Sequence, residues 1–351
     1  MNKEFTALHF ELTNKCNLRC SHCYNIDYLE SENIDLSTEE AKIIIDKAKV
    51  LGCHFMGFSG GEPFIREDIF ELIEYVKEHP IHILTNGMYI NDETIRKLSE
   101  IGDLIIEFRI SVDGLKKHEE LRGVSSEVVL ENIKSLLKNE YIVTVNTMIT
   151  NENVHELFDM YNYFKAIKID RWRLDFIFNQ GNAQKNKLIF DFSPEQLTLL
   201  VNLVKLYIKE KPEFEMDINK LFRSAVLDDD SPIQFDLNSR PCSYQGSLTV
   251  RPTGDVSFCP SLGMTHGNLI NDSLDKIFSD KSWNDIVGLK VKDLNATCLE
   301  CDLLCYCGGG CRSDALYDVN DLYGYSEGTC KVVKVYASEV VPLIDFTPHI
   351  I

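Results

Sequence analysis

The sequence predicts an α/β protein in which a parallel sheet with outer helices precedes a cysteine-rich module. Two observations lead to this prediction. Strand and helix patterns alternate between residues 8 and 178, an order that produces parallel strands, in a sheet that is either open or curled into a partial barrel. The 12 cysteines gather towards the two ends of the 351-residue chain, with none between Cys53 and Cys242. In such sheets the active site lies at the carboxyl ends of the strands.

Each predicted element follows from a local pattern. Short apolar runs predict strands, and apolar residues repeated every three or four positions predict helices. Ser37 and Glu40 have the spacing of a capping box, and Ser193 before Pro194 marks another helix start. The strands are expected at 8–12, 54–58, 81–84, 104–112, 142–149 and 169–178. The helices are expected after Ser37 and at 68–77, 92–100, 127–137, 154–164 and 193–209, and the polar run 228–232 predicts a boundary.

The composition excludes several classes of protein. The chain has 36 Lys and Arg against 55 Asp and Glu, a net charge of −19, and this acidic field would repel nucleic acid. No run of about 18 apolar residues predicts a membrane-spanning helix, and the first residues lack the apolar core of a signal peptide. We therefore expect a cytoplasmic protein with no nucleic-acid or membrane partner. In that reducing compartment, 12 cysteines favour metal or redox chemistry over disulfides.

Three cysteines near the N-terminus, Cys16, Cys20 and Cys23, have the spacing C-x3-C-x2-C. Three thiolates on one short loop can ligate three irons of a [4Fe–4S] cube and leave the fourth iron without a protein ligand. The amino and carboxylate groups of S-adenosylmethionine can fill that position, which places its sulfonium where an electron can break an S–C bond. The alternatives are a three-ligand zinc site and unrelated core thiols, but zinc sites usually pair C-x2-C knuckles.

This loop resembles the signature of the radical SAM enzymes, and later residues match that family in order over roughly 5–180. Gly60, Gly61, Glu62 and Pro63 follow the second strand and resemble the family's GGEP motif. The glycines would let the backbone approach the ligand closely, and Glu62 can accept a hydrogen bond from a cationic amino group. An ordinary strand-to-helix turn is the alternative for this tetrapeptide.

The resemblance also implies roles for residues on later strands. Asn86 ends the third strand, and Asn146 lies in the fifth. Ser111 and Arg122 would hold the carboxylate of S-adenosylmethionine, for which the guanidinium fork is suited, and Asp113 would face the ribose. For Arg122, a surface salt bridge with one of the two preceding glutamates is the alternative.

The residues around the third cysteine are implied in adenine binding. His22 stands where the family usually has an aromatic residue, and Tyr24 follows Cys23. The backbone of this segment would meet the adenine. The isolated Cys53 lies at a predicted helix–strand junction, where a buried apolar thiol is expected.

The C-terminal cysteines form a second group. Seven of these eight cysteines have the spacing C-x11-G-x4-C, then C-x2-C-x5-C-x3-C, then a last cysteine after 18 intervening residues. They are Cys242, Cys259, Cys298, Cys301, Cys307, Cys311 and Cys330. This pattern resembles the SPASM domain, which carries two auxiliary iron–sulfur clusters. A pair of zinc ribbons is the alternative.

The resemblance implies two auxiliary [4Fe–4S] clusters. One would be held by Cys298, Cys301, Cys307 and Cys330. The other would take Cys242, Cys259 and Cys311. The fourth ligand of the second cluster stays open between Cys305, a substrate thiolate, water and a non-cysteine side chain.

The fold implied by the resemblance is a partial (β/α)6 TIM-like barrel with a C-terminal cysteine-rich α+β SPASM domain. The radical SAM core would cover 1–190 and a helical linker or bridging region 191–236. The SPASM domain would cover 237–336 and a C-terminal tail 337–351.

A protein with these parts is expected to cleave S-adenosylmethionine reductively to a 5′-deoxyadenosyl radical and to abstract a hydrogen from its substrate. Relatives often act anaerobically on ribosomal precursor peptides, forming thioether or carbon–carbon cross-links or oxidised residues. The expected partners are such a peptide, a separate leader-recognition protein and a ferredoxin- or flavodoxin-type reductant. Only 15 residues precede Cys16, so the leader-binding domain of many peptide maturases is expected to be absent. Pro260 follows Cys259 where sulfatase-maturating relatives carry aspartate, which argues against that activity.

Two further functions stay open. One is the tailoring of a small cofactor, such as a haem-precursor side chain, by the same radical chemistry. The other is a non-catalytic iron–sulfur electron carrier, which would leave the glycine-rich tetrapeptide, Ser111 and Arg122 without a role. No catalytic acid, base or radical relay can be assigned from the sequence.

Overall fold

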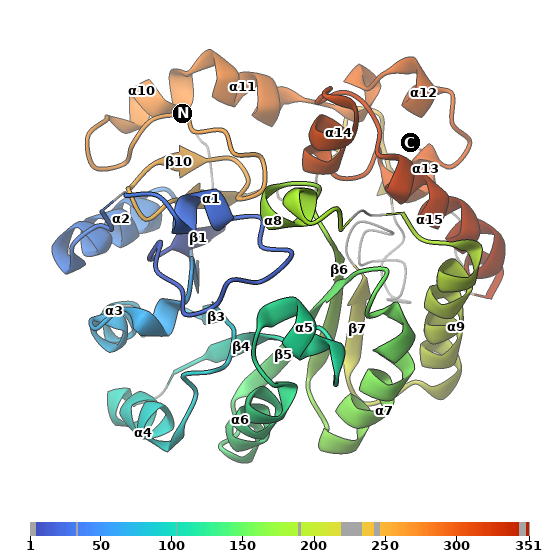
Figure 1. Ribbon diagram of the computed structural model, residues 1–351. Coiled ribbons are helices and arrows are strands. Elements are labelled where there is room, and N and C mark those ends of the chain that lie inside the picture. Colours follow the sequence, from blue (N-terminus) through green and yellow to red (C-terminus); the bar gives the residue numbers. More distant parts are fainter. Residues whose placement is uncertain are drawn as a thin grey trace.

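A curved sheet forms the centre of the computed structural model, which describes residues 5–32, 34–102, 104–188, 191–218, 234–241, 246–343 and 349–350 (Figure 1). Its strands are β1 (Ala7–Glu11), β2 (Phe55–Ser59), β3 (Ile81–Thr85), β4 (Ile106–Ser111), β5 (Ile142–Ile149), β6 (Arg171–Phe176), β7 (Glu215–Ile218), β9 (Ser247–Val250) and β10 (Val256–Ser257). Over the described residues their order is β10-β9-β1-β2-β3-β4-β5-β6-β7. A separate pair joins β8 (Gln234–Phe235) to β11 (His349–Ile350).

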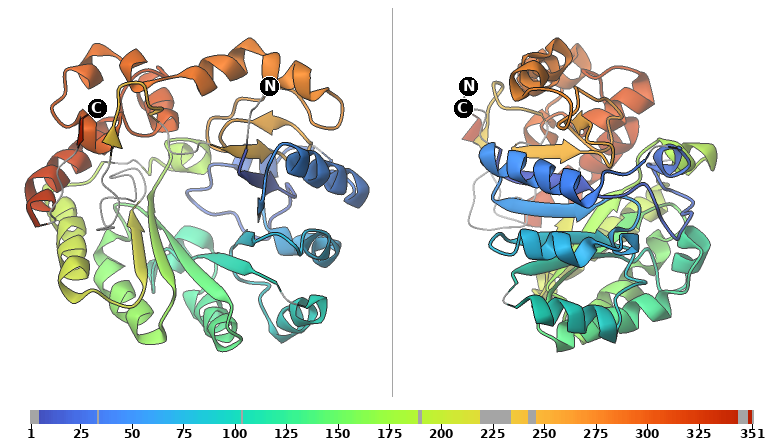
Figure 2. Two further views of the ribbon diagram at one scale, coloured as in Figure 1. Left: turned by 180° about the vertical axis from the view of Figure 1, so that it is seen from behind. Right: turned by 90° about the vertical axis from the view of Figure 1, so that its left-hand side faces the viewer.

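Helices cover the convex face of the sheet and build most of the C-terminal part (Figures 1 and 2). In the first part they are α1 (Ile26–Leu29), α2 (Thr38–Val50), α3 (Ile69–Tyr75), α4 (Asp92–Ile101), α5 (Lys117–Arg122), α6 (Ser126–Lys138), α7 (Leu157–Ile167), α8 (Gly181–Lys185) and α9 (Pro194–Glu210). In the second part they are α10 (Leu274–Ser279), α11 (Lys281–Gly288), α12 (Ala296–Leu299), α13 (Leu304–Cys307), α14 (Arg312–Val319) and α15 (Glu327–Glu339).

The structure confirms the predicted series of parallel strands and outer helices. Strands β1 to β6 are parallel to their neighbours, with Glu11 opposite Ser59 and Ser111 opposite Asn146. The predicted capping box at the start of α2 is present, because the Ser37 hydroxyl accepts from the Glu40 N–H and the Glu40 carboxylate accepts from the Ser37 N–H. Each predicted element is found within a few residues of its expected limits.

The sheet extends further than the six predicted strands. Strand β7 pairs in parallel with β6, inside the segment 191–236 that was expected to be helical. On the other side, β9 from the cysteine-rich part pairs in parallel with β1, with Ala7 opposite Ser247. Pairing of this kind covers the exposed edge of the first strand. The four domain limits stay predictions, and the boundary run 228–232 lies outside the described residues.

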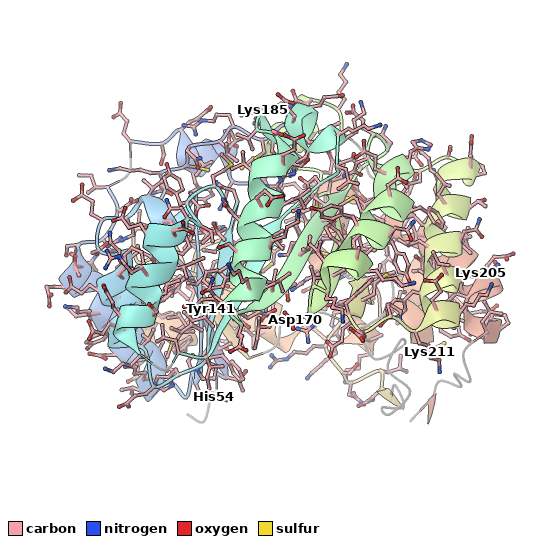
Figure 3. All side chains as sticks on the ribbon, turned by 90° about the horizontal axis from the view of Figure 1, so that it is seen from below. His54, Tyr141, Asp170, Lys185, Lys205 and Lys211 are labelled. Carbon is pink, nitrogen blue, oxygen red and sulfur yellow. The ribbon has the colours of Figure 1, made fainter. Side chains whose placement is uncertain are left out.

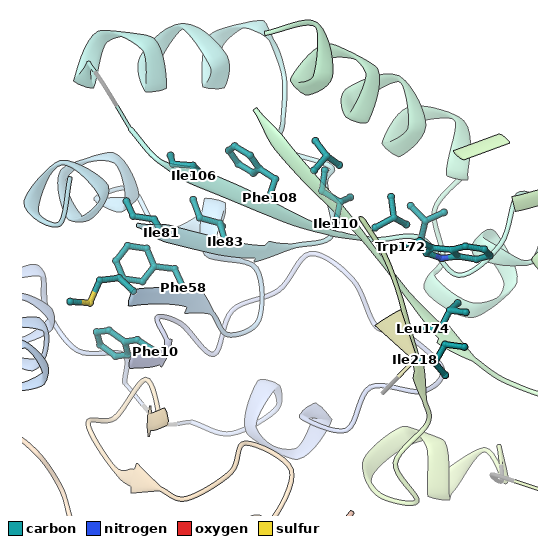
Figure 4. Close-up of a cluster of buried hydrophobic side chains, with 14 of the residues drawn as sticks. Phe10, Phe58, Ile81, Ile83, Ile106, Phe108, Ile110, Trp172, Leu174 and Ile218 are labelled. Atoms are coloured by element: carbon teal, nitrogen blue, oxygen red, sulfur yellow. The ribbon is translucent and has the colours of Figure 1, made fainter. Parts of the chain in front are cut away.

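The core lies between the convex face of the sheet and the helices. Side chains alternate along each strand, so that Phe108 is buried against the helices whereas its neighbours Glu107 and Arg109 point to the concave face. Figure 4 shows the apolar layer continuing from Phe10 through Phe58 and Phe108 to the last strands. The predicted burial of Cys53 is confirmed, since its exposed fraction is 2%.

The C-terminal part connects the two ends of the curved sheet. At one end β9 pairs with β1, and at the other α15 packs against α9, where Lys205 Nζ lies 2.8 Å from a Glu339 carboxylate oxygen. Figure 1 shows this part running from α10 across to α15 above the strands. The cysteine-rich segment is therefore anchored at both ends of the sheet.

The two ends of the strands carry different loops. In Figure 3 His54, Tyr141 and Asp170, which precede β2, β5 and β6, lie at one end of the sheet, and Lys185 of α8 lies at the opposite end. The Asp170 carboxylate accepts from the Val143 N–H at 2.7 Å and thereby fixes the start of β5. None of the described helices is long and apolar enough to cross a membrane.

Trp172 provides a test of the core. Its ring is fully buried between Phe164 and Phe214, and its Nε1–H donates to Thr147 Oγ1 at 2.9 Å. Replacement by alanine should lower the free energy of unfolding by about 3–5 kcal/mol, because it leaves a large cavity. Urea unfolding would measure the loss. Phe55→Ala, at a ring that is 44% exposed, should cost clearly less, and equal losses would contradict this packing.

Candidate cluster and cofactor site

The loop with the first three cysteines follows β1 and lies on the carboxyl ends of the neighbouring strands. It is fixed by backbone hydrogen bonds, because the Gly61 N–H donates to the Thr13 carbonyl at 2.7 Å and the Glu62 N–H to the Lys15 carbonyl at 2.8 Å. On its other side the Ser21 N–H donates to the Leu121 carbonyl at 2.8 Å. All three cysteines, Cys16, Cys20 and Cys23, are half-buried free thiols.

The two glycines after β2 are required by the contact with this loop. A Cβ at Gly61 would lie 2.1 Å from the Lys15 carbonyl oxygen, and one at Gly60 would lie 2.6 Å from the Thr13 carbonyl oxygen. Gly60 also has a φ of +129°, which side chains rarely tolerate. The sequence reasoning assigned the glycines to ligand approach, which stays a prediction. The structure gives them a second role, which is to let the cysteine loop pack directly on the turn.

Glu62 is fully buried at the end of this turn. Its carboxylate accepts from the Thr85 hydroxyl at 2.8 Å, from the Asn86 N–H at 2.8 Å and from the Phe64 N–H at 3.2 Å. Burial raises the pKa of Glu62 to about 7, although these donors act in the opposite direction. The buried Pro63 starts the following 3₁₀ turn. Glu62 is therefore a fixed carboxylate whose charge changes near neutral pH.

Asn86 connects the third strand to the cysteine loop. Its side-chain Nδ2 donates to Asn17 Oδ1 at 2.8 Å, and its Oδ1 accepts from the Met88 N–H at 3.0 Å. Tyr24, on the far side of the loop, packs edge-on against Phe178, with ring centroids 5.7 Å apart. The structure thus brings Glu62, Asn86 and the cysteine loop together, and places Tyr24 beside the segment after β6.

A buried ion pair lies beneath the second cysteine. Arg122 Nε donates to Asp113 Oδ2 at 2.5 Å, and its Nη1 lies 3.9 Å from Cys20 Sγ. The surface-salt-bridge alternative for Arg122 is therefore wrong in this structure, since the neighbouring Glu120 pairs with Lys117. Burial alone would raise the pKa of Asp113, but Arg122 and two nearby histidines bring it below its usual value.

Two histidines complete the surroundings of Asp113. His22 Nε2 lies 3.3 Å from Asp113 Oδ2, and His118 Nδ1 accepts from the Asp113 N–H at 3.1 Å. Burial lowers the pKa of each imidazole to about 4, so both are neutral at pH 7. Asp113 Oδ1 accepts from the Met148 N–H at 2.8 Å. Both oxygens of Asp113 thus have protein donors, and its contact with a ribose stays a prediction.

Ser111 ends β4 and lies side by side with Asn146 in the middle of β5, because the strand register pairs them. Both are half-buried on the concave face. The Asn146 Oδ1 atom is buried and has no hydrogen-bond partner among the described residues. A buried acceptor without a donor is costly, so this atom fits a site that a polar ligand completes.

The concave face below these residues is polar. His9 Nε2 lies 3.0 Å from Ser59 Oγ, and Arg109 Nη2 donates to Glu107 Oε2 at 2.8 Å. Burial lowers the pKa of His9 to about 4 and that of His82 to about 3. The interior of the curved sheet therefore presents neutral imidazoles and paired charges towards any bound substrate.

Sequence reasoning missed the residues of α8 that hold the cysteine loop from the opposite side. Asn182 donates from Nδ2 to the Cys20 carbonyl and from its backbone N–H to the Cys23 carbonyl, both at 2.9 Å. Asn186 Nδ2 donates to the Ser21 carbonyl at 2.8 Å. A Cβ at Gly181 would lie 2.5 Å from the Cys23 carbonyl oxygen. Gly181, after the sixth strand, was the only local sign of this contact, because α8 and the cysteine loop are more than 150 residues apart in the sequence.

Four cysteines of the C-terminal group lie close enough to influence one another. Burial raises the pKa of Cys307 to about 11, and the charges of Cys330, Cys298 and Cys301 add to this effect. Burial also raises the pKa of Cys330, with further contributions from Cys298 and Cys301. This is the set that the resemblance assigned to one auxiliary cluster. Cys305 also lies near Cys301.

The second auxiliary set is only partly described. Cys259 is half-buried with its Sγ 3.2 Å from Ser261 Oγ, and Cys311 begins α14, whereas Cys242 lies outside the described residues. Ser313 Oγ donates to the Ser261 carbonyl at 2.7 Å and so ties the start of α14 to the Cys259 loop. Within the described ranges, no three His, Cys, Asp or Glu side chains are close enough to hold a single metal ion.

Comparison with known protein families agrees with this geometry. The family described as "Radical SAM superfamily" matches residues 10–164, and the one described as "Iron-sulfur cluster-binding domain", named SPASM, matches residues 242–302. The chain therefore contains a radical SAM domain and a SPASM domain. The matched ranges include the first cysteine loop and the start of the second cysteine group. The α/β fold with a barrel-like parallel sheet is the radical SAM fold.

The individual proteins that this chain resembles have names that refer to different substrates. It is 26% identical over 338 residues to the Fe-coproporphyrin III synthase of Methanosarcina barkeri, which covers 88% of this chain and 84% of that protein. It is 30% identical over 200 residues to the PqqA peptide cyclase of Granulibacter bethesdensis, covering 56% of this chain and 53% of that protein. Several AdoMet-dependent haem synthases are matched over about half their length.

Among solved structures, native anSMEcpe with bound AdoMet and the Cp18Cys peptide is similar in fold. The TM-score is 0.75 at 19% identity, and the alignment covers 96% of this chain and 97% of that one. At this identity the similarity concerns the fold. It extends through both the radical SAM and the SPASM parts of the chain.

Asn182→Ala tests the clamp on the cysteine loop. Losing the hydrogen bond to the Cys20 carbonyl should cost about 1 kcal/mol, which corresponds to roughly five-fold easier opening of the loop. In metal-free protein, Cys20 and Cys23 should then react several-fold faster with a thiol reagent, as followed by peptide mass spectrometry. Asn179→Ala is the matched control, because that side chain contacts the exposed Asp318 instead. Equal reaction rates in the two variants would contradict the clamp.

Proposed function

We propose that this protein cleaves S-adenosylmethionine reductively and abstracts a hydrogen from a peptide substrate, installing a cross-link or an oxidation. The observation that carries the proposal is the cysteine loop fixed over the strand ends, with Glu62 and Ser111 at those ends and Asn146 paired with Ser111. An electron carrier would need the thiols but not this set of polar groups. We place the reaction in a reducing cytoplasm.

The residues present fit a cluster and its nucleoside ligand. Three half-buried thiols on one loop match the donor set of a [4Fe–4S] cube with one open iron, and the orphaned Asn146 oxygen supplies an acceptor that a ligand can satisfy. When bound, the cluster supplies the electron that divides S-adenosylmethionine into methionine and the 5′-deoxyadenosyl radical. Cys16, Cys20 and Cys23 would hold it.

The remaining residues bind and orient. Glu62 would accept from the amino group of S-adenosylmethionine, next to Asn86 and the backbone at Gly60 and Gly61. Ser111 would contact its carboxylate, and Arg122, oriented by Asp113, would add positive charge at the same place. The backbone at Tyr24 would meet the adenine. Because Glu62, Asn86 and Ser111 lie at or just after the ends of strands, they would reach the bound ligand with little reorganisation.

The SPASM cysteines would hold two auxiliary [4Fe–4S] clusters, one on Cys298, Cys301, Cys307 and Cys330 and one on Cys242, Cys259 and Cys311 with a further ligand. Their role would be to accept an electron from the substrate radical. The first electron would come from a ferredoxin- or flavodoxin-type protein. A separate protein would present the leader of the precursor peptide.

A second candidate is the tailoring of a small cofactor. It is favoured by the Fe-coproporphyrin III synthase, whose similarity extends over 88% of this chain, whereas the similarity to the PqqA peptide cyclase covers 56%. Anaerobic incubation of reconstituted enzyme with candidate precursor peptides and, in parallel, with iron-coproporphyrin would separate the two. Tandem mass spectrometry would locate a mass change on one of them. A change on the porphyrin alone would replace the peptide proposal.

Cys16→Ala tests the cluster assignment. The reconstituted variant should lose the iron of one cluster and produce no 5′-deoxyadenosine with dithionite, because two thiolates do not retain the cube. Cys53→Ala is the matched control, since this buried thiol lies away from the loop and should leave both properties unchanged. Absence of 5′-deoxyadenosine from the wild type would refute the radical chemistry. Unchanged production by Cys16→Ala would refute the ligand assignment.

The pKa of Glu62 gives a pH dependence for binding of S-adenosylmethionine. The carboxylate must be ionised to accept from the amino group, and burial raises its pKa to about 7 in the free protein. Below that pH, Glu62 must lose a proton when S-adenosylmethionine binds. The affinity for S-adenosylmethionine should therefore fall by up to about ten-fold for each unit by which the pH is lowered. Above it, the affinity should level off. Calorimetric titration between pH 6 and pH 8.5 would show this slope, and Glu62→Gln should remove it.

A further inference from the structure

A buried arginine joins the two cysteine-bearing parts of the chain. Arg251, which follows β9, has an exposed fraction of 1%. Its Nη1 donates to Glu11 Oε2 at 2.7 Å, and Glu11, the last residue of β1, is 2% exposed. The guanidinium also stacks on Tyr28, with Cζ 4.5 Å from the ring centroid. A charge pair so far from water persists only where its geometry is closely satisfied.

The same guanidinium holds both cysteine loops. Nη1 also donates to Asn25 Oδ1 at 3.1 Å, two residues after Cys23, and Asn25 Nδ2 in turn donates to Glu11 Oε1 at 3.0 Å. Nη2 donates to the carbonyl of Pro260 at 2.6 Å, immediately after Cys259. One planar fork therefore bonds to a loop on each side, and neither loop can shift without breaking one of these hydrogen bonds.

We propose that Arg251 is a positioning residue that sets the spacing between the cluster of the first cysteine loop and the auxiliary cluster that includes Cys259. This inference rests on the proposed function, because it needs both clusters. The fork geometry matters as much as the charge. A lysine in its place would carry the charge but could not present two nitrogens in a plane to Glu11 and Pro260.

The positive charge has a second consequence. Because Arg251 Nη2 donates to the carbonyl of Pro260, the residue directly after Cys259, the guanidinium charge lies beside that cysteine. A cation near a cluster favours its reduced form, which carries one more negative charge. Spacing and charge can therefore be tested separately, by variants that change one and keep the other.

The experiment uses reconstituted enzyme that carries the whole chain, four variants at the arginines, and Cys259→Ala to identify which cluster's potential is followed. Arg251→Met removes the fork and the charge, Arg251→Lys keeps the charge, and Arg251→Met/Glu11→Gln removes the fork and both charges. Arg171→Met is the matched control, because Arg171 pairs with Glu215 at the far end of the sheet. Redox titration with electron paramagnetic resonance gives each cluster's midpoint potential, and the magnetic interaction between reduced clusters, which falls with the cube of their distance, reports the spacing.

The expected pattern differs between the variants. The midpoint potential of the cluster lost in Cys259→Ala should shift downward in Arg251→Met and return towards the wild-type value in Arg251→Lys and in the double variant. The magnetic interaction between the two clusters should change in all three and stay unchanged in Arg171→Met. Arg251→Met leaves the charge of Glu11 buried without a partner, whereas the double variant does not. Comparing the thermal unfolding of the two variants therefore measures the stability lost through that unpaired charge, separately from the change in cluster spacing.

Two outcomes would refute either the positioning role of Arg251 or the function on which it rests. If wild-type enzyme assembles its clusters and Arg251→Met leaves the magnetic interaction unchanged, or alters it no more than Arg171→Met does, the positioning role of Arg251 is refuted. If the wild type assembles no clusters, the proposed function itself fails. The two failures are distinguished by the iron content of the wild type.

Discussion

The close backbone contact between the cysteine loop and the turn after β2 is the constraint on which the site depends. Gly61 has no room for a side chain because the Lys15 carbonyl would lie 2.1 Å from its Cβ. The contact brings two consecutive N–H groups, of Gly61 and Glu62, onto the loop. It therefore fixes the orientation of the three thiols relative to the strand ends and to Glu62.

Two buried ion pairs orient neighbouring parts of the chain more than they stabilise the fold. Asp113 with Arg122 and Glu11 with Arg251 are both carboxylate–arginine pairs with almost no exposure of the carboxylate. Such pairs contribute little net stability, because desolvation offsets most of the attraction. Each has a partner next to a cysteine loop, so their value lies in the fixed geometry they impose there. Of the two neutral histidines around Asp113, His118 accepts a hydrogen bond from the Asp113 N–H without adding charge.

The C-terminal cysteine-rich part is structurally continuous with the barrel. Strand β9 extends the sheet beyond β1, and α15 packs on α9 at the other end. The auxiliary cysteines are thereby held in one frame with the first cysteine loop instead of on a separate unit. The proposed electron transfer between clusters would require a short and constant separation, which this arrangement would supply through main-chain hydrogen bonds as well as through Arg251.

The sequence by itself determined the local features of this protein. The spacing of Cys16, Cys20 and Cys23, the glycine-rich turn and the capping box at Ser37 each involve residues within a few positions of one another, so pattern and chemistry suffice to identify them. The order of strands and helices followed for the same reason. It was also enough to place the candidate site at the carboxyl ends of the strands.

Only the tertiary structure decided which distant residues meet. Arg251 pairs with Glu11 across 240 positions, Asn182 holds a loop 162 positions earlier, and β9 pairs with β1. Arg122 pairs with Asp113, which follows β4, whereas the neighbouring Glu120 pairs with Lys117. No local sequence pattern predicts these pairings, because they form only when the fold brings residues that are far apart in the sequence next to one another.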